Sequence, residues 1–303
     1  MAAMSDTKTI RVISPVEPIT GHALVKVTRM QQITEVQYSQ HRNFFPTIQR
    51  LKHNRYVVLS TGELKVFARN DNRAQNLASL RASLKRLRRL INNNFSGAAD
   101  ELFITLTYAE DVSDPKQISK DFDGFIKRLR RRFTTFDYIK IAEPQGRLKS
   151  GRAVWHYHLL LKGVAYITPD DLAKTWRHGY VKVKALQDVD DIGRYLTSYM
   201  ANIPLEELRH TDGFEGNPPI VDKNVAGQKK AFVKRGRLQY YPSGMNFYSS
   251  SRGIKAPTSN YMSYNEIKQT GHLGKLTSAS EVVIESPGFS NKVITEEYNA
   301  RRH

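Results

Sequence analysis

The sequence contains no cysteine among its 303 residues. Disulfide frameworks, cysteine-ligated zinc or iron–sulfur sites and thiol nucleophiles are therefore excluded for this chain. Long apolar runs are also missing, since no stretch of about 18 apolar residues occurs, so no transmembrane helix is expected. The first 20 residues lack the basic and then apolar layout of a signal peptide. These absences predict a cytoplasmic protein without a membrane partner.

Acidic residues are scarce compared with basic ones. The chain has 47 Lys and Arg against 29 Asp and Glu, which gives a formal net charge of +18. Hydrophobic residues make up 40 % and aromatic residues 10 % of the chain, enough to fill a core, so the chain is not disordered throughout. Such an excess of positive charge predicts a polyanionic partner, most simply nucleic acid. A high isoelectric point is also common in proteins that merely lie near nucleic acid.

Three parts are expected along the chain. Residues 1–54 show weak periodicity and predict a partly ordered N-terminal arm. Residues 55–205 carry the strong patterns and predict the main domain. Residues 206–303 form a basic extension, with loop and short helix expected over 205–230 and one β-like patch at 282–284. This extension either binds DNA or packs on the core.

The main domain alternates strand and helix patterns. Apolar residues recur from Leu77 to Ile91 at spacings of three and four, which predicts a helix with one apolar stripe. The pair 138–143 and 153–161 is joined by a loop short enough for an antiparallel hairpin. The fold class is therefore α+β, a mostly antiparallel sheet with flanking helices. Strands are expected at 55–67 as a hairpin, 101–108, 138–143, 153–161 and 179–185, and helices at 77–91, 118–133, from 168, and 189–201.

Two histidines, His156 and His158, lie in the apolar strand pattern 153–161. Strand side chains alternate, so both imidazoles point to the same face and can bind one metal ion. A single histidine in a strand is more often a hydrogen-bonded core residue, but two buried neighbours without a metal would need separate partners. The pair therefore leaves metal binding and a structural role open.

Glu143 ends the preceding strand of the expected hairpin. The hairpin brings this carboxylate near the start of the histidine strand, where it can supply an oxygen ligand. Two histidines and one carboxylate suit a divalent ion that also holds substrate oxygens, such as Mg²⁺ or Mn²⁺. Taken alone, Glu143 is more simply a solvent-facing residue at a turn.

Two tyrosines, Tyr195 and Tyr199, lie four residues apart in the helix expected over 189–201. Side chains at this spacing share one face of a helix. A tyrosine pair of this kind usually packs on a core. The surrounding residues are small and polar, however, so the tyrosines are free for another role.

Together, these features resemble the HUH endonuclease superfamily, and within it the rolling-circle replication initiators (Rep proteins) of bacterial plasmids and phages. The strand 103–108 resembles the first family motif, residues 156–158 the histidine motif, and Tyr195 and Tyr199 the two-tyrosine form of the tyrosine motif. Glu143 matches the third metal ligand. The resemblance covers residues 70–205 and implies a ferredoxin-like, RRM-like fold for the domain.

The resemblance implies a site-specific DNA nickase and strand transferase. Its metal would be held by His156, His158 and Glu143. Tyr199 as first and Tyr195 as second nucleophile would form a 5′-phosphotyrosine link, leaving a 3′-OH for a polymerase. The DNA would be single-stranded or cruciform origin DNA in a bacterial host. Because no Gly-x-x-x-x-Gly-Lys-Ser/Thr motif occurs, a host helicase would do the unwinding.

The chain departs from the family pattern where a lysine usually follows each tyrosine by three residues, since Ser198 and Asn202 stand there. DNA binding is expected from basic residues in two helices and the segment 223–255, whose aromatics Tyr240, Tyr241, Phe247 and Tyr248 either stack on bases or fill the core. The candidates are Arg130, Arg131, Arg132, Arg194, Lys234, Arg235, Arg237 and Arg252. Alternative functions are a two-tyrosine transposase, a relaxase, and a non-catalytic nucleic-acid-binding domain.

Overall fold

The computed structural model divides the chain into two compact units. Residues 1–69 and 257–303 form one unit, and residues 70–256 form the other. The structure describes residues 9–42, 45–67, 77–147, 153–186, 191–193, 196, 203–204, 220–225, 228–233, 241, 245–286 and 288–301. The expected boundaries at residues 54 and 205 do not coincide with this division, because the two ends of the chain fold together.

The unit of residues 70–256 contains an antiparallel sheet of five strands in the order β10-β7-β9-β8-β14. The expected α+β class, with an antiparallel sheet and flanking helices, is confirmed. The predicted hairpin is also confirmed, since β8 and β9 are adjacent and antiparallel. The strands are β7 (Glu101–Thr107), β8 (Asp137–Arg147), β9 (Ala153–Lys162), β10 (Val181–Ala185) and β14 (Tyr248–Ser250).

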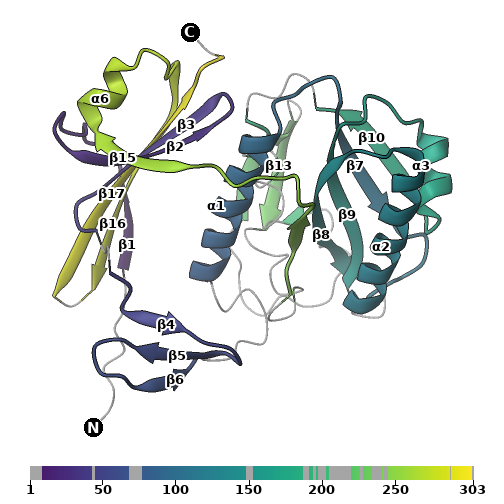
Figure 1. Cartoon of the computed structure of the whole chain (residues 1–303), viewed down its shortest axis with the longest axis horizontal. Coiled ribbons are helices and arrows are strands. Elements are labelled where there is room, and N and C mark those ends of the chain that lie inside the picture. Colours follow the sequence, from purple (N-terminus) through teal and green to yellow (C-terminus); the bar gives the residue numbers. More distant parts are fainter. Residues whose placement is uncertain are drawn as a thin grey trace. The chain divides into compact units, whose positions relative to one another are not determined.

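Three helices flank this sheet: α1 (Leu77–Asn94), α2 (Pro115–Arg132) and α3 (Pro169–Trp176). Figure 1 shows α1 on one side of the sheet and α2 and α3 on the other. On the α2 side, the ring of Phe122 lies 4.9 Å from that of Tyr157 on β9, between centroids. None of the helices in the described ranges is long and apolar enough to cross a membrane.

The starts of α2 and α3 follow from their sequences. Asp114 is the N-cap of α2 and accepts a hydrogen bond from the Lys116 amide at 2.9 Å, with proline in the first helical position. Thr168 caps α3 in the same way, accepting from the Asp171 amide at 3.1 Å. The three arginines at the end of α2 are also favoured by the negative end of the helix dipole.

The turn between α1 and β7 is organised by Glu101. This carboxylate is 1 % exposed and accepts hydrogen bonds from the backbone amides of Ser96, Gly97 and Ala98 at 2.9, 2.7 and 3.1 Å. A buried charge is tolerated when it is fully hydrogen-bonded. Glu101 therefore determines where β7 begins relative to α1.

A small sheet follows in the chain, formed by β11 (Ile203–Pro204), β12 (Ile220–Val225) and β13 (Gln228–Val233) in the order β11-β13-β12. The expectation of loop and short helix over residues 205–230 is therefore wrong for 220–225 and 228–230. The apolar residues of these strands lie at their outer ends around a charged middle, which hides the strand pattern.

The other unit contains a six-stranded antiparallel sheet in the order β1-β16-β17-β3-β2-β15. The expected N-terminal arm is therefore corrected from Thr9 onward: β1 pairs with β16, and β3 pairs with β17. The buried residues of this unit include Val25, Val36 and Ile294. The strands are β1 (Thr9–Ile13), β2 (Leu24–Met30), β3 (Ile33–Ser39), β15 (Ser259–Ser263), β16 (Lys275–Ser286) and β17 (Phe289–Asn299), with the helix α6 (Tyr264–Gln269).

A separate three-stranded sheet has the order β4-β5-β6. It consists of β4 (Ile48–Arg50), β5 (Arg55–Val58) and β6 (Leu64–Val66). The hairpin predicted over residues 55–67 is confirmed by the antiparallel pairing of β5 with β6.

Candidate metal centre

The antiparallel register of β8 and β9 brings three polar side chains together. Glu143 lies directly opposite His156, and Ile141 lies opposite His158. Because side chains alternate along a strand, Glu143, His156 and His158 all project from the same face of the sheet. The hairpin therefore places the three expected metal ligands side by side.

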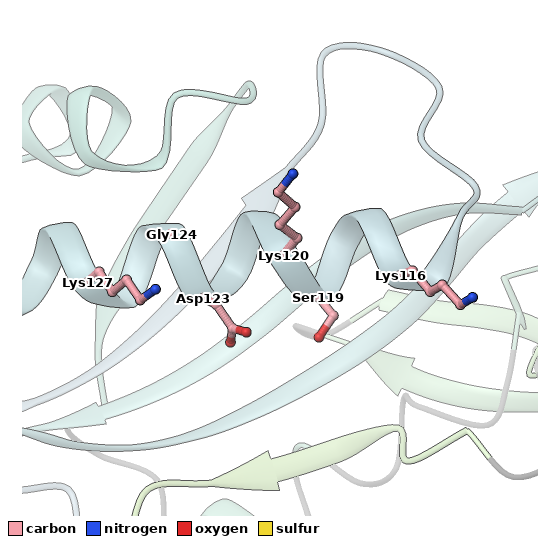
Figure 2. A pocket seen from close by; sticks show the side chains of 6 residues that line it. All are labelled: Lys116, Ser119, Lys120, Asp123, Gly124 and Lys127. Carbon is pink, nitrogen blue, oxygen red and sulfur yellow. The ribbon is translucent and has the colours of Figure 1, made fainter.

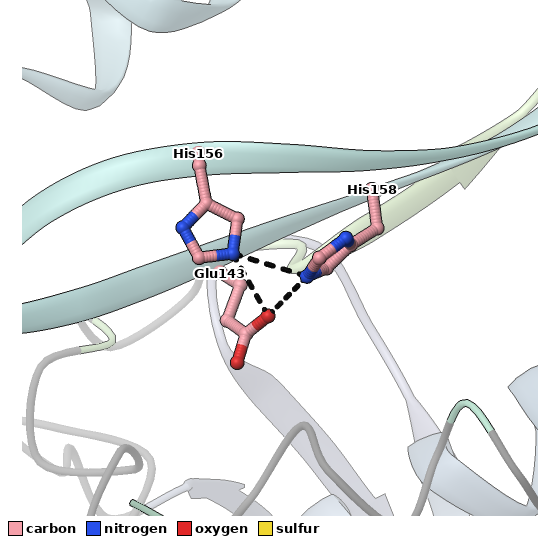
Figure 3. A group of neighbouring side chains, drawn as sticks. All are labelled: Glu143, His156 and His158. Atoms are coloured by element: carbon pink, nitrogen blue, oxygen red, sulfur yellow. Dashed lines mark hydrogen bonds and ion pairs between the residues drawn. The ribbon is translucent and has the colours of Figure 1, made fainter. Parts of the chain in front are cut away.

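The ligand atoms of these residues converge closely (Figure 3). Glu143 Oε2 lies 3.0 Å from His156 Nε2 and 2.5 Å from His158 Nε2. The two Nε2 atoms are 3.0 Å apart. Two imidazole nitrogens and a carboxylate oxygen within 4.8 Å of one another form a donor set that fits a divalent cation.

The burial of the three side chains differs. Glu143 is 4 % and His156 5 % exposed, whereas the His158 side chain is 22 % exposed. A buried carboxylate next to two imidazoles requires compensation by protons or by a cation. A metal ion would provide this compensation, and the more open His158 side leaves access for a substrate oxygen.

His158 is oriented by two residues of β7. Thr105 Oγ1 lies 3.2 Å from His158 Nδ1, and Thr105 is the register partner of His158. The ring of Phe103 stacks on the imidazole with centroids 5.3 Å apart. A hydrogen bond at one ring nitrogen selects the tautomer and directs the other nitrogen toward a metal. Thr105 and Phe103 are functional candidates that the sequence pattern did not single out.

The alternate positions of β9 hold the histidine face in place. Trp155 and Tyr157 are each 2 % exposed and belong to the core. Trp155 packs against Tyr241 with ring centroids 5.6 Å apart, and Tyr157 packs against Phe122. Burial raises the pKa of Tyr157 above its usual value. Turning β9 over would expose these aromatics, so the register is strongly specified.

Of the two roles left open for the aromatics of segment 223–255, the core role is confirmed for two residues. Tyr241 and Phe247 are 2 % and 4 % exposed, and Tyr241 donates a hydrogen bond from its hydroxyl to the Ala142 carbonyl at 2.9 Å. Tyr248 is partly buried against the same core. Tyr240 lies outside the described residues.

The segment that leads to the expected tyrosines is described only at residues 191–193 and 196. Ile192 and Leu196 are buried in the core. The Gly193 amide donates a hydrogen bond to Asn92 Oδ1 of α1 at 2.8 Å. Arg194, Tyr195 and Tyr199 lie outside the described residues, so their expected roles stay predictions.

The expected DNA-binding arginines of α2 lie on the helix that covers the sheet face opposite the metal centre. The Arg130 guanidinium lies 4.6 Å from the centre of the Phe136 ring. Arg132 forms an ion pair with Asp171 at 2.7 Å, whereas Arg131 is exposed. Arg252 is also exposed, and Lys234, Arg235 and Arg237 lie outside the described residues.

Comparison with known proteins identifies one similarity. Residues 101–203 match the family model of the replication-associated protein ORF2. No curated protein and no solved structure matches the chain. The matched segment runs from β7 to β11 and contains Glu143, His156 and His158. This part of the chain is therefore similar to a family of replication-associated proteins.

Proposed function

We propose that the chain initiates rolling-circle DNA replication as an HUH-type nickase and strand transferase. The observation that carries this proposal is the convergence of Glu143, His156 and His158 inside the segment similar to replication-associated proteins. The net charge of +18 agrees with a nucleic-acid substrate. The proposed setting is the cytoplasm of a bacterial host.

Glu143, His156 and His158 would hold the metal, proposed as Mg²⁺ or Mn²⁺. When bound, such an ion binds phosphate oxygens and neutralises the charge that develops on them. The buried carboxylate of Glu143 would balance part of the ion's charge. Thr105 would keep His158 in the tautomer whose Nε2 carries a lone pair toward the ion.

A tyrosine would supply the covalent step, with Tyr199 acting first. Its phenolic oxygen attacks phosphorus and loses its proton, the bond from phosphorus to the 3′ oxygen breaks, and that oxygen leaves as a 3′-OH after taking up a proton. The new 5′-phosphotyrosine link preserves the energy of the broken bond. A later attack by a 3′-OH can therefore rejoin DNA, and Tyr195 would serve a second transfer that closes the displaced strand.

The substrate would be an origin strand in single-stranded or cruciform form, because the phosphate must leave the duplex to reach the hairpin. The released 3′-OH would prime a host polymerase. A host helicase would separate the strands ahead of it.

Mass spectrometry of the covalent adduct tests the proposal. The chain is incubated with Mn²⁺ and overlapping single strands from its own replicon. The expected product is one tyrosine peptide carrying a 5′-linked nucleotide. Tyr199→Phe with Tyr195→Phe should abolish the adduct, and His156→Ala should abolish both the adduct and Mn²⁺ binding. Undiminished adducts in the double tyrosine variant would overturn the nucleophile assignment, and no adduct on any strand would favour a non-catalytic binding role.

A further inference from the structure

The outward face of α2 carries a row of lysines. Lys116, Lys120 and Lys127 are exposed, while Phe122 and Phe125 on the opposite side of the helix are buried. Figure 2 shows these lysine side chains extending from the helix at a surface hollow of about 590 Å³. The complete lining is Lys116, Ser119, Lys120, Asp123, Gly124 and Lys127, with Asp123 as its single acid.

A second hollow of about 500 Å³ lies where α2 ends and β8 meets the chain after β14. Two arginines from distant segments, Arg130 and Arg252, line it together. Four hydroxyl side chains complete its polar lining: Thr134, Thr135, Ser250 and Ser251. Guanidinium groups with surrounding hydroxyls are the donors that proteins use for phosphate. We call this hollow the Arg130–Arg252 groove.

The one acid of the groove is already engaged. Asp137 Oδ1 accepts hydrogen bonds from Ser251 Oγ at 2.7 Å and from the Gly253 amide at 3.1 Å. Within the described ranges, neither Arg130 nor Arg252 forms an ion pair with a carboxylate, whereas the neighbouring Arg132 is paired with Asp171 at 2.7 Å. The two groove arginines therefore keep their charge available for an external anion.

The groove cannot be the site of the nicked phosphate. Asp137 and Glu143 are separated by about 20 Å along β8, at about 3.3 Å per residue. The lysine row adds length, since Lys116 and Arg130 lie about 21 Å apart along α2, at about 1.5 Å per residue. A row of this length matches several successive phosphates of one DNA strand.

We propose that the Arg130–Arg252 groove and the lysine row of α2 bind the phosphate backbone of DNA that flanks the nicked position. This inference rests on the proposed function for the identity of the polyanion as DNA. The surface offers charge and hydroxyl donors rather than a set of base-reading side chains, so it holds DNA without regard to sequence. It would keep the flanking DNA attached while the hairpin processes the origin.

Salt-dependent binding tests the groove without any chemistry. The full chain is titrated with fluorescent duplex and single-stranded DNA of unrelated sequence, with a chelator present, at several salt concentrations. In Arg130→Gln with Arg252→Gln, the slope of log K against log salt should fall by about 2, because each lost phosphate contact removes about 1. Affinity should fall by a similar factor on every sequence.

Arg131→Gln is the matched control, because it removes the same charge from the same helix outside the groove. It should change the slope by clearly less than either groove variant. An equal change in all three variants would overturn the groove and leave only a general charge effect. A larger change on duplex than on single strands identifies duplex as the flanking DNA, and the reverse identifies single strands; each result supports the groove.

Adduct formation on the origin strand separates this inference from the proposed function. Adducts together with an unchanged salt slope in the groove variants would refute the groove alone. A groove-dependent slope without adducts from the unmutated chain would refute the nickase and leave the groove in place.

Discussion

Asn92 of α1 receives the Gly193 backbone amide on its side-chain oxygen at 2.8 Å. The same side chain donates from Nδ2 to the Asp191 carboxylate at 2.8 Å, and Asn92 is 4 % exposed. A Cβ on Gly193 would lie 2.6 Å from the Arg88 carbonyl oxygen, so only glycine allows this approach. The chain that leads to Tyr195 is thereby attached to α1 immediately before the expected nucleophiles.

Gly193→Ala should therefore destabilise the protein and slow adduct formation. The added methyl group must displace the backbone of α1 or of residues 191–193, and overpacking of this kind costs about 1–3 kcal/mol. Urea unfolding measures the loss of stability. Adduct formation under saturating Mn²⁺ measures the effect on the tyrosine segment, and Mn²⁺ affinity should stay unchanged because the hairpin is not touched.

Gly124→Ala is the matched control for this prediction. Gly124 lies inside α2, where a Cβ would meet only the flexible end of the Arg128 side chain, at 3.1 Å. Alanine is favoured over glycine inside a helix by about 0.5–1 kcal/mol, so this variant should be as stable as the parent or more stable. Equal stability of Gly193→Ala and the parent would contradict the close packing at Gly193.

The elements that were predictable from the sequence are those with local causes. The α2 helix has a proline, a capping aspartate and a regular apolar stripe, and the β8–β9 hairpin has a short connection. The sheet of the other unit depends on partners at opposite ends of the chain, such as Thr9 opposite Glu285. Neither strand carries a signal that names its partner, so the N-terminal segment resembled an arm.

Removal of the Glu101 carboxylate should destabilise the unit of residues 70–256. Glu101→Ala leaves three backbone amides in the turn 96–98 without their acceptor. An unsatisfied buried group costs about 1–3 kcal/mol, so the loss should reach several kcal/mol, and Glu101→Gln should lose less because its amide oxygen still accepts. Denaturant unfolding measures both. Asp100→Asn removes the adjacent charge and should change stability little; equal losses at both positions would contradict the role of Glu101.

Alkaline pH should destabilise the protein through two buried tyrosines. Burial raises the pKa of Tyr108, and the nearby Asp121 carboxylate raises it further; burial likewise raises the pKa of Tyr157. In the unfolded chain both phenols lose their protons near pH 10. The folded state then binds more protons than the unfolded state, so stability falls as pH rises above about 10.

Urea unfolding at increasing pH measures this effect. Tyr157→Phe should reduce the slope of stability against pH by one proton above about pH 10. Tyr180→Phe is the control, because Tyr180 is 78 % exposed and its hydroxyl can be removed without touching the two buried phenols. A spectroscopic titration in which Tyr108 and Tyr157 ionise near pH 10 in the folded protein, as they do when unfolded, would contradict the prediction.

The candidate site was predictable from the sequence only as far as its ligands. Spacing placed His156 and His158 on one face, and the hairpin placed Glu143 beside them, which agrees with the convergence of their ligand atoms in the structure. Thr105 and Phe103 escaped notice because they reach His158 through the pairing of β7 with β9, and a sequence does not state which strands pair. Asn92 escaped notice for the same reason, since its partners lie about a hundred residues away.

Thr105→Val should weaken metal binding while the ligands themselves stay in place. Valine keeps the shape of threonine but removes the hydroxyl that holds His158 Nδ1 at 3.2 Å. Loss of such a partner typically costs about 10- to 100-fold in metal affinity, because the ligand no longer holds its tautomer and orientation. Titration of Mn²⁺ by electron paramagnetic resonance, without DNA, measures the change.

Two further variants separate this role from a general effect on β7. Thr105→Ser restores a hydroxyl and should recover most of the affinity. Thr107→Val makes the same substitution two residues away on the same face of β7, opposite His156, where the described contacts include no hydrogen bond between the two side chains. It should leave Mn²⁺ affinity unchanged. If Thr107→Val and Thr105→Val weakened binding equally, the effect would come from the strand as a whole, and Thr105 would have no specific part in orienting His158.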